Sequence, residues 1–478
     1  MSARTPFRVV VAGGGASGLA AAFRLQTLAK ATRIPLELHL LEASERFGGC
    51  IRTSRREGFL IESGPDCFLS EKIGGLKLIQ ELGLSDQLLN THSDFRRSFI
   101  LRQNVLYPIP EGFYLLAPSR LLSFLRSPMM SWSGKVRLLM EPLIQRRSLP
   151  DESLASFVRR RMGSEALEQL AQPLIAGIYA ADPETLSLRA TFPRFIEMEH
   201  GGGILWALQQ PSTATRQASG ARYSLFVTLR DGLQTLTDAL ENALPPESLH
   251  RGTTLRRLVF SPDTQENIWH AETDQGFLMV DAVVLALPAY ASAQVLSELG
   301  PALAESLASI PYGSVATLNL AYRSADVGHA LDGFGYVAPA REGRPVMACT
   351  FVHRKFAGRV PEGYVLLRAF LGGASQESLL ANSDAELTRL ALSDLSSLLN
   401  IKWKPLWTSL QRWPRSMPQY TVGHLDRLEA IERGQTQWPG LALAGNWRHG
   451  VGVPDCLESG GQAAEKVWEW RETLGKNV

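Results

Sequence analysis

The chain has 478 residues, of which 45% are hydrophobic and 20% charged, which suits two or three domains with sizeable cores rather than a disordered protein. Its 49 Lys and Arg residues and 47 Asp and Glu residues leave a net charge of +2, so no global charge attracts nucleic acid and none is expected as a partner. The four cysteines show no C-x-x-C pair and no histidine at ligand spacing, which argues against a disulfide framework and against a metal site.

The cysteines and the apolar runs also bear on location. Free thiols suit a reducing compartment, so the cytoplasm is expected. No segment has the pattern of a signal peptide, and no run of 18 apolar residues predicts a transmembrane helix.

A strand that turns directly into a helix is the strongest early signal. Residues 9–19 read VVVAGGGASGL, and the apolar residues of 19–28 recur at helical spacing. The G-x-G-x-x-G spacing allows a tight turn, a close backbone approach to phosphate and close helix–strand packing, and the helix N-terminus attracts the anion. An ordinary glycine turn is the alternative. The residues expected to contact a dinucleotide here are Gly13, Gly14, Gly15, Ala16, Ser17 and Gly18.

A second predicted strand, 36–41, ends in Glu42, at the distance from the glycines where a carboxylate accepts hydrogen bonds from ribose hydroxyls. The next residues, 42–52, read EASERFGGCIR. Their Gly-Gly-x-x-Arg resembles the motif that follows the dinucleotide fold in FAD-dependent amine oxidases, carotenoid desaturases and protoporphyrinogen oxidases. The resemblance implies non-covalent FAD, with arginines near phosphate; a solvated basic turn is the alternative. The residues implied are Glu42, Ala43, Arg46, Gly48, Gly49 and Arg52.

A short predicted strand within 57–68 leads into a Ser-Gly-Pro-Asp turn. Glycine and proline shape such turns. With FAD present, Gly64, Pro65 and Asp66 are expected to bring backbone beside the isoalloxazine ring. A plain hairpin turn is equally compatible with the pattern.

The pattern changes after 95–110, where alternating apolar and polar residues predict a strand that enters a different domain. Residues 112–161 interleave large apolar side chains with arginines, and between 119 and 161 nine Lys and Arg accompany three Asp and Glu, a local charge of +6. This composition predicts helices that bind a membrane surface or an acidic ligand. A helical core with a solvated basic face fits equally well.

The remaining elements alternate between helical and α/β patterns. Helices are predicted at 157–170, 196–209, 233–244 and 383–399, and from Cys456 onward. Strands are predicted at 253–258, 268–273, 282–286, 315–322, 335–338, 346–352, 365–371 and 441–446.

These elements predict an α/β plus α+β protein with three regions. A discontinuous FAD-binding Rossmann-like domain is assigned to 1–90, 226–298 and 421–478. A mixed-sheet substrate domain is assigned to 91–111 and 299–420. A helical, membrane-binding and substrate-channel domain is assigned to 112–210, and a mobile loop to 211–225.

Three later segments carry a more specific resemblance. Residues 175–193 contain IAGIYAADP, LS and ATFP, residues 412–425 contain RWP and PQYTVGHL, and residues 450–460 read GVGVPDCLESG. Together they resemble the oxygen-dependent porphyrinogen oxidases nearly end to end. One departure is Ala181, which stands where that family usually has glycine.

The resemblance implies an enzyme of haem synthesis that oxidises protoporphyrinogen IX by six electrons, reducing three dioxygen molecules to hydrogen peroxide. Coproporphyrinogen III is the nearest alternative, followed by a flavin amine oxidase or desaturase and by a non-catalytic FAD-bound membrane scaffold. The family also implies a homodimer. Separately, the apolar and basic segment at about 112–162 predicts peripheral binding to one leaflet, at the cytoplasmic face of the membrane. No catalytic side chain is expected, because the flavin performs the chemistry.

The family resemblance also implies individual substrate contacts. Arg97 matches the residue that pairs with a substrate carboxylate, with Arg96 the alternative if the register is off by one. Gly177 matches the residue whose carbonyl orients pyrrole N–H groups. The apolar positions that enclose the macrocycle are Phe334, Val337, Thr350 and Phe370. Thr350 is more polar than the usual leucine, and Phe370 equally suits a sheet core.

For FAD, the resemblance adds residues far along the chain. Their alternative role is to form the domain core, above all for Leu255. They are Leu255, Trp413, Asn446, Val451, Gly452 and Val453.

Overall fold

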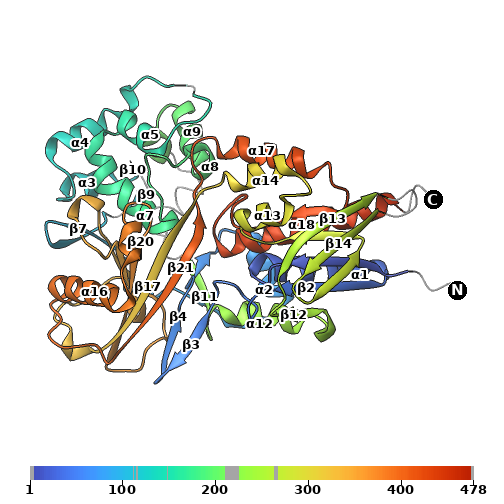
Figure 1. The fold of residues 1–478 in the computed structure, drawn as a ribbon. Coiled ribbons are helices and arrows are strands. Elements are labelled where there is room, and N and C mark those ends of the chain that lie inside the picture. The colour runs from blue at the N-terminus through green and yellow to red at the C-terminus, as the bar shows by residue number, and fades with distance from the viewer. Residues whose placement is uncertain are drawn as a thin grey trace.

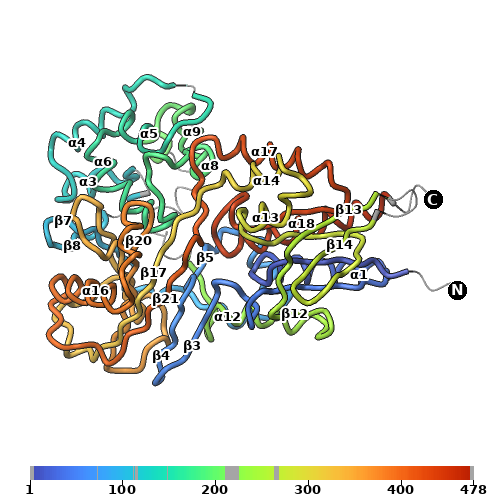
Figure 2. Tube along the Cα trace, viewed as in Figure 1, coloured from blue at the N-terminus to red at the C-terminus, as the bar shows by residue number. Residues whose placement is uncertain are grey.

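Three regions make up the chain (Figure 1). The computed structural model describes residues 5–110, 112–114, 117–147, 149–209, 226–262 and 267–474. A parallel sheet lies on the right of the view, a larger mixed sheet at the lower left and a group of helices at the upper left. Both ends of the described chain lie at the far end of the parallel sheet (Figure 2).

The parallel sheet has five strands drawn from distant parts of the chain. Their order is β12 (Leu249–Arg251), β2 (Leu36–Glu42), β1 (Phe7–Ala12), β16 (Ala282–Leu285) and β22 (Leu441–Leu443). Each neighbouring pair is parallel. β1 is fully apolar apart from Arg8 because both of its faces are covered.

Helices cover one face of this sheet, and helices with a small antiparallel sheet cover the other. The first face carries α1 (Ala16–Thr32), α2 (Ile73–Glu81), α12 (Gln234–Asn242) and α18 (Val453–Leu474). The second carries α13 (Ala289–Leu296), α14 (Pro301–Ala308), α17 (His424–Gln435), β13 (Leu255–Pro262), β14 (Asn267–Thr273) and β15 (Gly276–Val280). Helix α14 therefore packs with the parallel sheet, rather than with the substrate segment, 299–420, in which it was expected.

The second large sheet has seven strands. Their order is β21 (Trp407–Pro418), β17 (Tyr312–Arg323), β20 (Tyr364–Gly372), β19 (Ala348–Phe351), β18 (Gly335–Val337), β7 (Phe99–Arg102) and β8 (Val105–Pro108). Only the β18–β7 pair is parallel among them. Helix α16 (Asp384–Leu399) packs on the back face through a leucine-rich core. The long strands β17 and β21 run from this sheet toward the parallel one (Figure 1).

Small sheets join the two large ones. The hairpin β3 (Thr53–Arg56) and β4 (Phe59–Glu62) packs on the seven-stranded sheet, where Phe59 and Ile61 contact Leu366 and Trp407. A second small sheet contains β5 (Phe68–Leu69), β11 (Phe226–Leu229) and β6 (Leu88–Asn90). The hairpin thereby lays the turn that follows β4 against the seven-stranded sheet.

The helical region is more broken than its sequence pattern indicated. Its elements are β9 (Phe113–Tyr114), β10 (Ala117–Pro118), α3 (Leu121–Arg126), α4 (Trp132–Leu139), η2 (Glu141–Leu143), α5 (Leu154–Arg161), α6 (Ser164–Ala166), η3 (Leu167–Ala171), α7 (Gln172–Tyr179), α8 (Leu188–Thr191), α9 (Pro193–His200) and α10 (Ile204–Gln209). The single helix expected at 196–209 was wrong, because Gly202 and Gly203 have φ values of +122° and separate α9 from α10. The loop expected at 211–225 lies outside the described residues. Within the described part of the chain, no helix combines the length and the apolar character that a membrane crossing requires.

A buried ion network stabilises the helical region. Arg161 pairs with Glu141, and both side chains are at most 1% exposed. The two Glu141 oxygens also accept hydrogen bonds from the backbone N–H groups of Ile204 and Leu205, each at 3.1 Å. Arg160 lies alongside and pairs with Glu199 at 2.6 Å. The network therefore fixes α10 against α5.

These ion pairs revise the expected local charge of +6. Arg159, Arg160 and Arg161 all pair with carboxylates, two of which come from beyond residue 161. Lys135 is 5% exposed and donates to the Leu125 carbonyl at 2.8 Å. Part of the basic character therefore lies inside the fold, while Arg120, Arg126, Arg146, Arg147 and Arg159 are exposed.

Replacing Arg161 tests the energetic role of this network. Arg161→Met leaves Glu141 buried without its cation, and we expect the free energy of unfolding to fall by about 3–5 kcal/mol. The matched control is Arg159→Met, which breaks the exposed pair with Glu184 and is expected to cost at most about 1 kcal/mol. Urea denaturation of both variants measures the difference, and equal losses would contradict a buried network.

Candidate functional site

The turn between β1 and α1 has the shape of a phosphate cradle. Gly13 has a φ of +101°, and a Cβ on Gly18 would lie 1.7 Å from the Gly13 carbonyl oxygen. A Cβ on Gly15 would instead meet only the Gly49 Cα, at 4.0 Å. Gly13 and Gly18 therefore close the turn, whereas Gly15 borders open space before the N-terminus of α1. The residues present fit a bound pyrophosphate.

Glu42 lies beside this turn, at the carboxyl end of β2. Its Oε2 accepts a hydrogen bond from Gly14 N at 2.8 Å. Its Oε1 accepts from Ser44 N at 2.8 Å and from Ser44 Oγ at 2.7 Å. A carboxylate has about four lone-pair sites, so acceptor capacity remains for ribose hydroxyls. Ala43 lies between these residues in the same bend.

The second glycine loop packs directly against the first. Gly48 N donates to the Gly14 carbonyl at 2.8 Å. Arg46 donates to the carbonyls of Gly49, at 2.8 Å, and Ile51, at 2.6 Å, so its guanidinium holds the loop in place. Burial lowers the pKa of Arg46 and the nearby positive charge of Arg52 lowers it further, an arrangement that favours an anion nearby.

The turn after β4 lies between this loop and the seven-stranded sheet. A Cβ on Gly64 would lie 1.7 Å from the Cys50 carbonyl oxygen, so only glycine fits. The Ser63 carbonyl accepts hydrogen bonds from Thr317 Oγ1, at 2.8 Å, and Trp413 Nε1, at 3.0 Å. The turn is therefore fixed on both sides, and Trp413 reaches it as a hydrogen-bond donor.

Asp66 forms a buried ion pair at the end of this turn. Its Oδ2 lies 2.8 Å from Lys355 Nζ, and the Lys355 charge holds the pKa of Asp66 well below its usual range against the effect of burial. Burial raises the pKa of the adjacent Cys67 thiol to about 12. The Asp66 carboxylate is therefore engaged by Lys355.

The C-terminal segment packs against α1, next to the first glycine turn. A Cβ on Gly460 would lie 2.0 Å from the Ser17 carbonyl oxygen, so α18 crosses α1 closely. Cys456 lies near Ser17 and Cys50, and burial raises its pKa to about 12. This contact places 451–453, just before and at the start of α18, near the second glycine loop.

Asn446 and Leu255 occupy different surroundings. The Asn446 carbonyl accepts a hydrogen bond from Tyr420 Oη at 2.5 Å, and its Nδ2 donates to the Ser416 carbonyl at 3.2 Å. Leu255 is 7% exposed and packs in the core that includes Leu41. Its side chain thus has the domain-core environment that was its alternative role.

The front face of the seven-stranded sheet carries most of the predicted substrate residues. Strand pairing aligns Val337 with Ala348, Ala348 with Phe370, and Phe370 with Thr317. Paired residues in antiparallel strands project to the same face, so these side chains form one row. The parallel row beside it contains Gly335, Thr350, Arg368 and Asn319.

Helix α7 covers the other side of this row. A Cβ on Gly177 would lie 3.4 Å from Val337 Cγ1. The last carbonyls of a helix have no partner within it and carry partial negative charge. Here the carbonyls of Tyr179 and Ala180 already accept from Gln419 Nε2, at 3.3 Å, and Ala374 N, at 2.8 Å, whereas the Gly177 carbonyl accepts from no donor outside the helix among the described residues.

The remaining predicted substrate residues lie at the rim. Arg97 is half exposed, and its Nη1 lies 3.1 Å from Asp332 Oδ2. Its backbone carbonyl accepts from Phe334 N at 2.8 Å, which ties the buried Phe334 to the same corner. Arg96 is also exposed, so both arginines remain candidates for binding a carboxylate.

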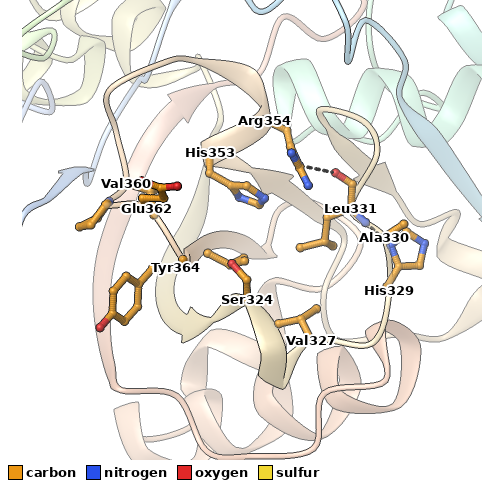
Figure 3. Close-up of a pocket in the computed structure, with 13 residues that line it drawn as sticks. Ser324, Val327, His329, Ala330, Leu331, His353, Arg354, Val360, Glu362 and Tyr364 are labelled. Atoms are coloured by element: carbon orange, nitrogen blue, oxygen red, sulfur yellow. Dashed lines mark hydrogen bonds between the residues drawn. The ribbon is translucent and has the colours of Figure 1, made fainter.

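A separate pocket lies on loops around 324–331 and 360–365 (Figure 3). Its lining includes His329, His353, Arg354 and Tyr364, and Arg354 Nε donates to the Leu331 carbonyl at 3.2 Å. Burial lowers the pKa of His353 to about 4, so this imidazole is neutral at neutral pH. None of the predicted cofactor or substrate residues lines this pocket, which sets it apart from the site above.

Sequence analysis missed four polar residues that contact the turn at 62–66, namely Thr317, Asn319, Lys355 and Arg368. Three of them occupy alternate, inward positions in otherwise apolar strands, in VATLNLA and LLRAFL. The sequence did offer one signal, namely Arg368, a charged residue within a strand that reads as buried. Because burying an unpaired charge is costly, such a residue indicates a partner nearby in the fold.

Comparisons with known proteins agree with this geometry. The model of the family described as flavin containing amine oxidoreductase matches residues 16–468. A coproporphyrinogen III oxidase of Bacillus subtilis (strain 168) is 36% identical over 458 residues, covering 95% of this chain and 96% of its own. The chloroplastic protoporphyrinogen oxidase 1 of Spinacia oleracea is 30% identical over 484 residues, covering 96% and 83%.

A solved structure from Exiguobacterium sp. 255-15, described provisionally as a protoporphyrinogen oxidase, is also similar. It has a TM-score of 0.84 and 30% sequence identity, and the match covers 97% of this chain and 99% of that one. The mixed α/β fold expected from the sequence is thus confirmed, as is the presence of a flavin cofactor.

Gly15 provides a test of the cradle that does not depend on turnover. In Gly15→Ala the new methyl group meets no protein atom closer than 4.0 Å, but it fills the space before α1. We expect normal folding and FAD affinity reduced on the order of tenfold or more. The matched control is Gly461→Ala on α18, where no atom lies within 4 Å. Flavin fluorescence titration measures both, and unchanged affinity in Gly15→Ala would contradict the assignment.

Proposed function

Because this chain belongs to the flavin-containing amine oxidoreductase family, we propose that it is an FAD-dependent porphyrinogen oxidase. The reaction removes six electrons from a reduced tetrapyrrole in three two-electron steps, and three dioxygen molecules become three molecules of hydrogen peroxide. The observation that carries the proposal is the apolar row formed by Val337, Ala348 and Phe370, which lies between helix α7 and the turn at 62–64.

The cofactor site uses residues from the first and last segments of the parallel-sheet region, a discontinuous Rossmann-like arrangement. The glycine turn at 13–18 holds the pyrophosphate, Glu42 holds the ribose, and the segments at 48–52, 64–66 and 451–453 border the ring. When bound, FAD supplies the two-electron oxidation. The protein contributes binding, orientation and exclusion of water.

The substrate face orients the macrocycle through shape and polarity. Phe370 offers a flat aromatic surface for a pyrrole ring. The carbonyl of Gly177, in the C-terminal turn of α7, accepts hydrogen bonds from pyrrole N–H groups. Thr350 places a hydroxyl near the substrate face, at the position where the usual leucine would make an apolar contact with the macrocycle.

The carboxylate side chains of the substrate require a cation at the rim. Arg97 is half exposed and already holds one carboxylate, that of Asp332. A substrate carboxylate in the same position would satisfy the guanidinium with two parallel hydrogen bonds. The Arg97–Asp332 pair thus marks where a substrate carboxylate would bind.

Two porphyrinogens are candidate substrates. The sequence analysis placed protoporphyrinogen IX first. Coproporphyrinogen III, which carries more carboxylates, is the second candidate, because the Bacillus subtilis relative at 36% identity is named for its oxidation.

Turnover of both porphyrinogens tests the function. We expect FAD-loaded protein in air to form fluorescent porphyrin, and Arg97→Ala to raise KM on the order of tenfold with a smaller effect on kcat, because the arginine binds substrate before and during reaction alike. Arg389→Ala, which breaks an exposed pair on α16, is the matched control. Turnover of neither porphyrinogen would contradict the proposal, and turnover of amines would favour an amine oxidase instead.

The helical region is proposed to bind one leaflet of a membrane at the cytoplasmic face. Trp132 and Val136 lie four residues apart on α4, Met140 directly follows its last residue, and all three are exposed. Leu143 is 80% exposed on the adjoining η2, and Trp206 is 58% exposed on α10, which contacts η2. This apolar patch of five residues favours insertion of side chains into an interface.

Vesicle co-sedimentation tests the apolar patch. We expect Trp132→Glu combined with Leu143→Glu to abolish binding to vesicles of mixed neutral and anionic lipid. Trp403→Glu, at a tryptophan 69% exposed outside the helical region, is the matched control and should bind normally. Absence of binding by the unmodified protein would refute the proposal. A fall in oligomer mass in the double variant, with vesicle binding unchanged, would instead assign the patch to the expected homodimer.

A further inference from the structure

Five charged side chains lie together beneath the turn at 62–64. This charge cluster consists of Glu62, Asp66, Lys355, Arg359 and Arg368. Glu62, Arg359 and Arg368 are at most 7% exposed. Three cations accompany two carboxylates, so the cluster carries at least one net positive charge inside the protein.

The pairing within the charge cluster shows where the excess positive charge lies. Asp66 pairs with Lys355 at 2.8 Å. Arg359 is held on its far side by three acceptors of β11 and the following residue, at 2.8 to 3.2 Å. No carboxylate of the described residues forms an ion pair with Arg368. Arg359 likewise forms no ion pair with a carboxylate of the described residues, so the excess positive charge is shared by Arg359 and Arg368, of which Arg368 lies against the Ser63–Gly64 turn.

Arg368 also holds the turn directly. Its Nη2 donates to the Gly64 carbonyl, next to the Ser63 carbonyl that Thr317 and Trp413 engage. Its guanidinium carbon lies 4.9 Å from the centre of the Phe370 ring. One side chain thus contacts both the turn assigned to the cofactor ring and the aromatic residue assigned to the substrate.

The polar groups around Arg368 are buried and only partly satisfied. Its Nε and the Asn319 Oδ1 are buried and have no hydrogen-bond partner among the described residues. Both residues line a small internal cavity, together with Glu62, Asp66 and Arg359. In such low-dielectric surroundings a fixed charge acts strongly on a neighbouring group.

We propose that Arg368 is a positioning residue that fixes the Ser63–Gly64 turn against the substrate sheet and raises the reduction potential of the bound FAD. A fixed positive charge behind the turn favours the form of the cofactor that carries more negative charge, which is the reduced form. This inference rests on the proposed function, because it takes the turn at 62–64 to border the flavin ring.

The midpoint potential of the FAD-loaded protein, measured by equilibration with redox dyes, tests this role. We expect Arg368→Met to have a lower potential than the unmodified protein, and anaerobic reduction of its FAD by porphyrinogen to slow on the order of tenfold or more. Arg368→Lys keeps the charge and is expected to restore most of the potential. If Arg368→Met does not fold, Arg368→Gln provides the same comparison.

Arg344→Met is the matched control, since Arg344 pairs with Asp394 at 2.5 Å on the back face of the same sheet. An unchanged potential in folded, FAD-bound Arg368→Met would overturn the inference. An equal fall in Arg344→Met would also overturn it, because the effect would then be a general loss of packing. An unmodified protein that binds no FAD would overturn the proposed function as well, which separates the two failures.

Discussion

The fold depends on hydrogen bonds that tie one turn to a distant sheet. Successive carbonyls at 62–64 accept donors from Asn319, Thr317, Trp413 and Arg368, on three different strands of the seven-stranded sheet. Buried carbonyls left without donors would cost about 1–3 kcal/mol each. The turn therefore has one stable position. That position fixes the geometry of the site between the two large sheets.

Two other contacts also shape the space beside this turn, namely the crossing of α1 and α18 and the cover formed by α7. The first and last motifs of the chain meet where α1 and α18 cross, so residues hundreds of positions apart lie beside the glycine turn proposed to bind FAD. The helical region supplies the C-terminus of α7 opposite the apolar row. Its buried ions hold this cover in place, while the apolar patch on α4 and its neighbours faces outward.

Local sequence signals were sufficient for some of this arrangement. The strand, glycine turn and helix at 7–32 follow from apolar runs and from positions where only glycine fits. The shared face of Val337 and Phe370 came from family resemblance rather than from pattern, since an apolar residue in a buried strand does not reveal its partner strand. The break between α9 and α10 was not predicted, because its two glycines, Gly202 and Gly203, lie inside an otherwise helical pattern.

Residues that act through distant partners were harder to predict. Arg368 matters because β20 pairs with β17 and faces the turn after β4, a relation that no local spacing encodes. The net charge of the segment 119–161 is incomplete for the same reason, since Glu184 and Glu199 pair with its arginines from outside that window and lower the local charge by two, from +6 to +4. Charge counted along the sequence is thus a poor guide to charge at the surface.

The measurement that tests the account most directly is the stoichiometry of the aerobic reaction. Dioxygen uptake, hydrogen peroxide release and porphyrin formation would be recorded together in a closed cell containing FAD-loaded protein and either porphyrinogen. The account predicts three molecules of dioxygen consumed and three of peroxide released for each porphyrin formed. A ratio near one, or porphyrin that forms at the rate of the enzyme-free control, would contradict it.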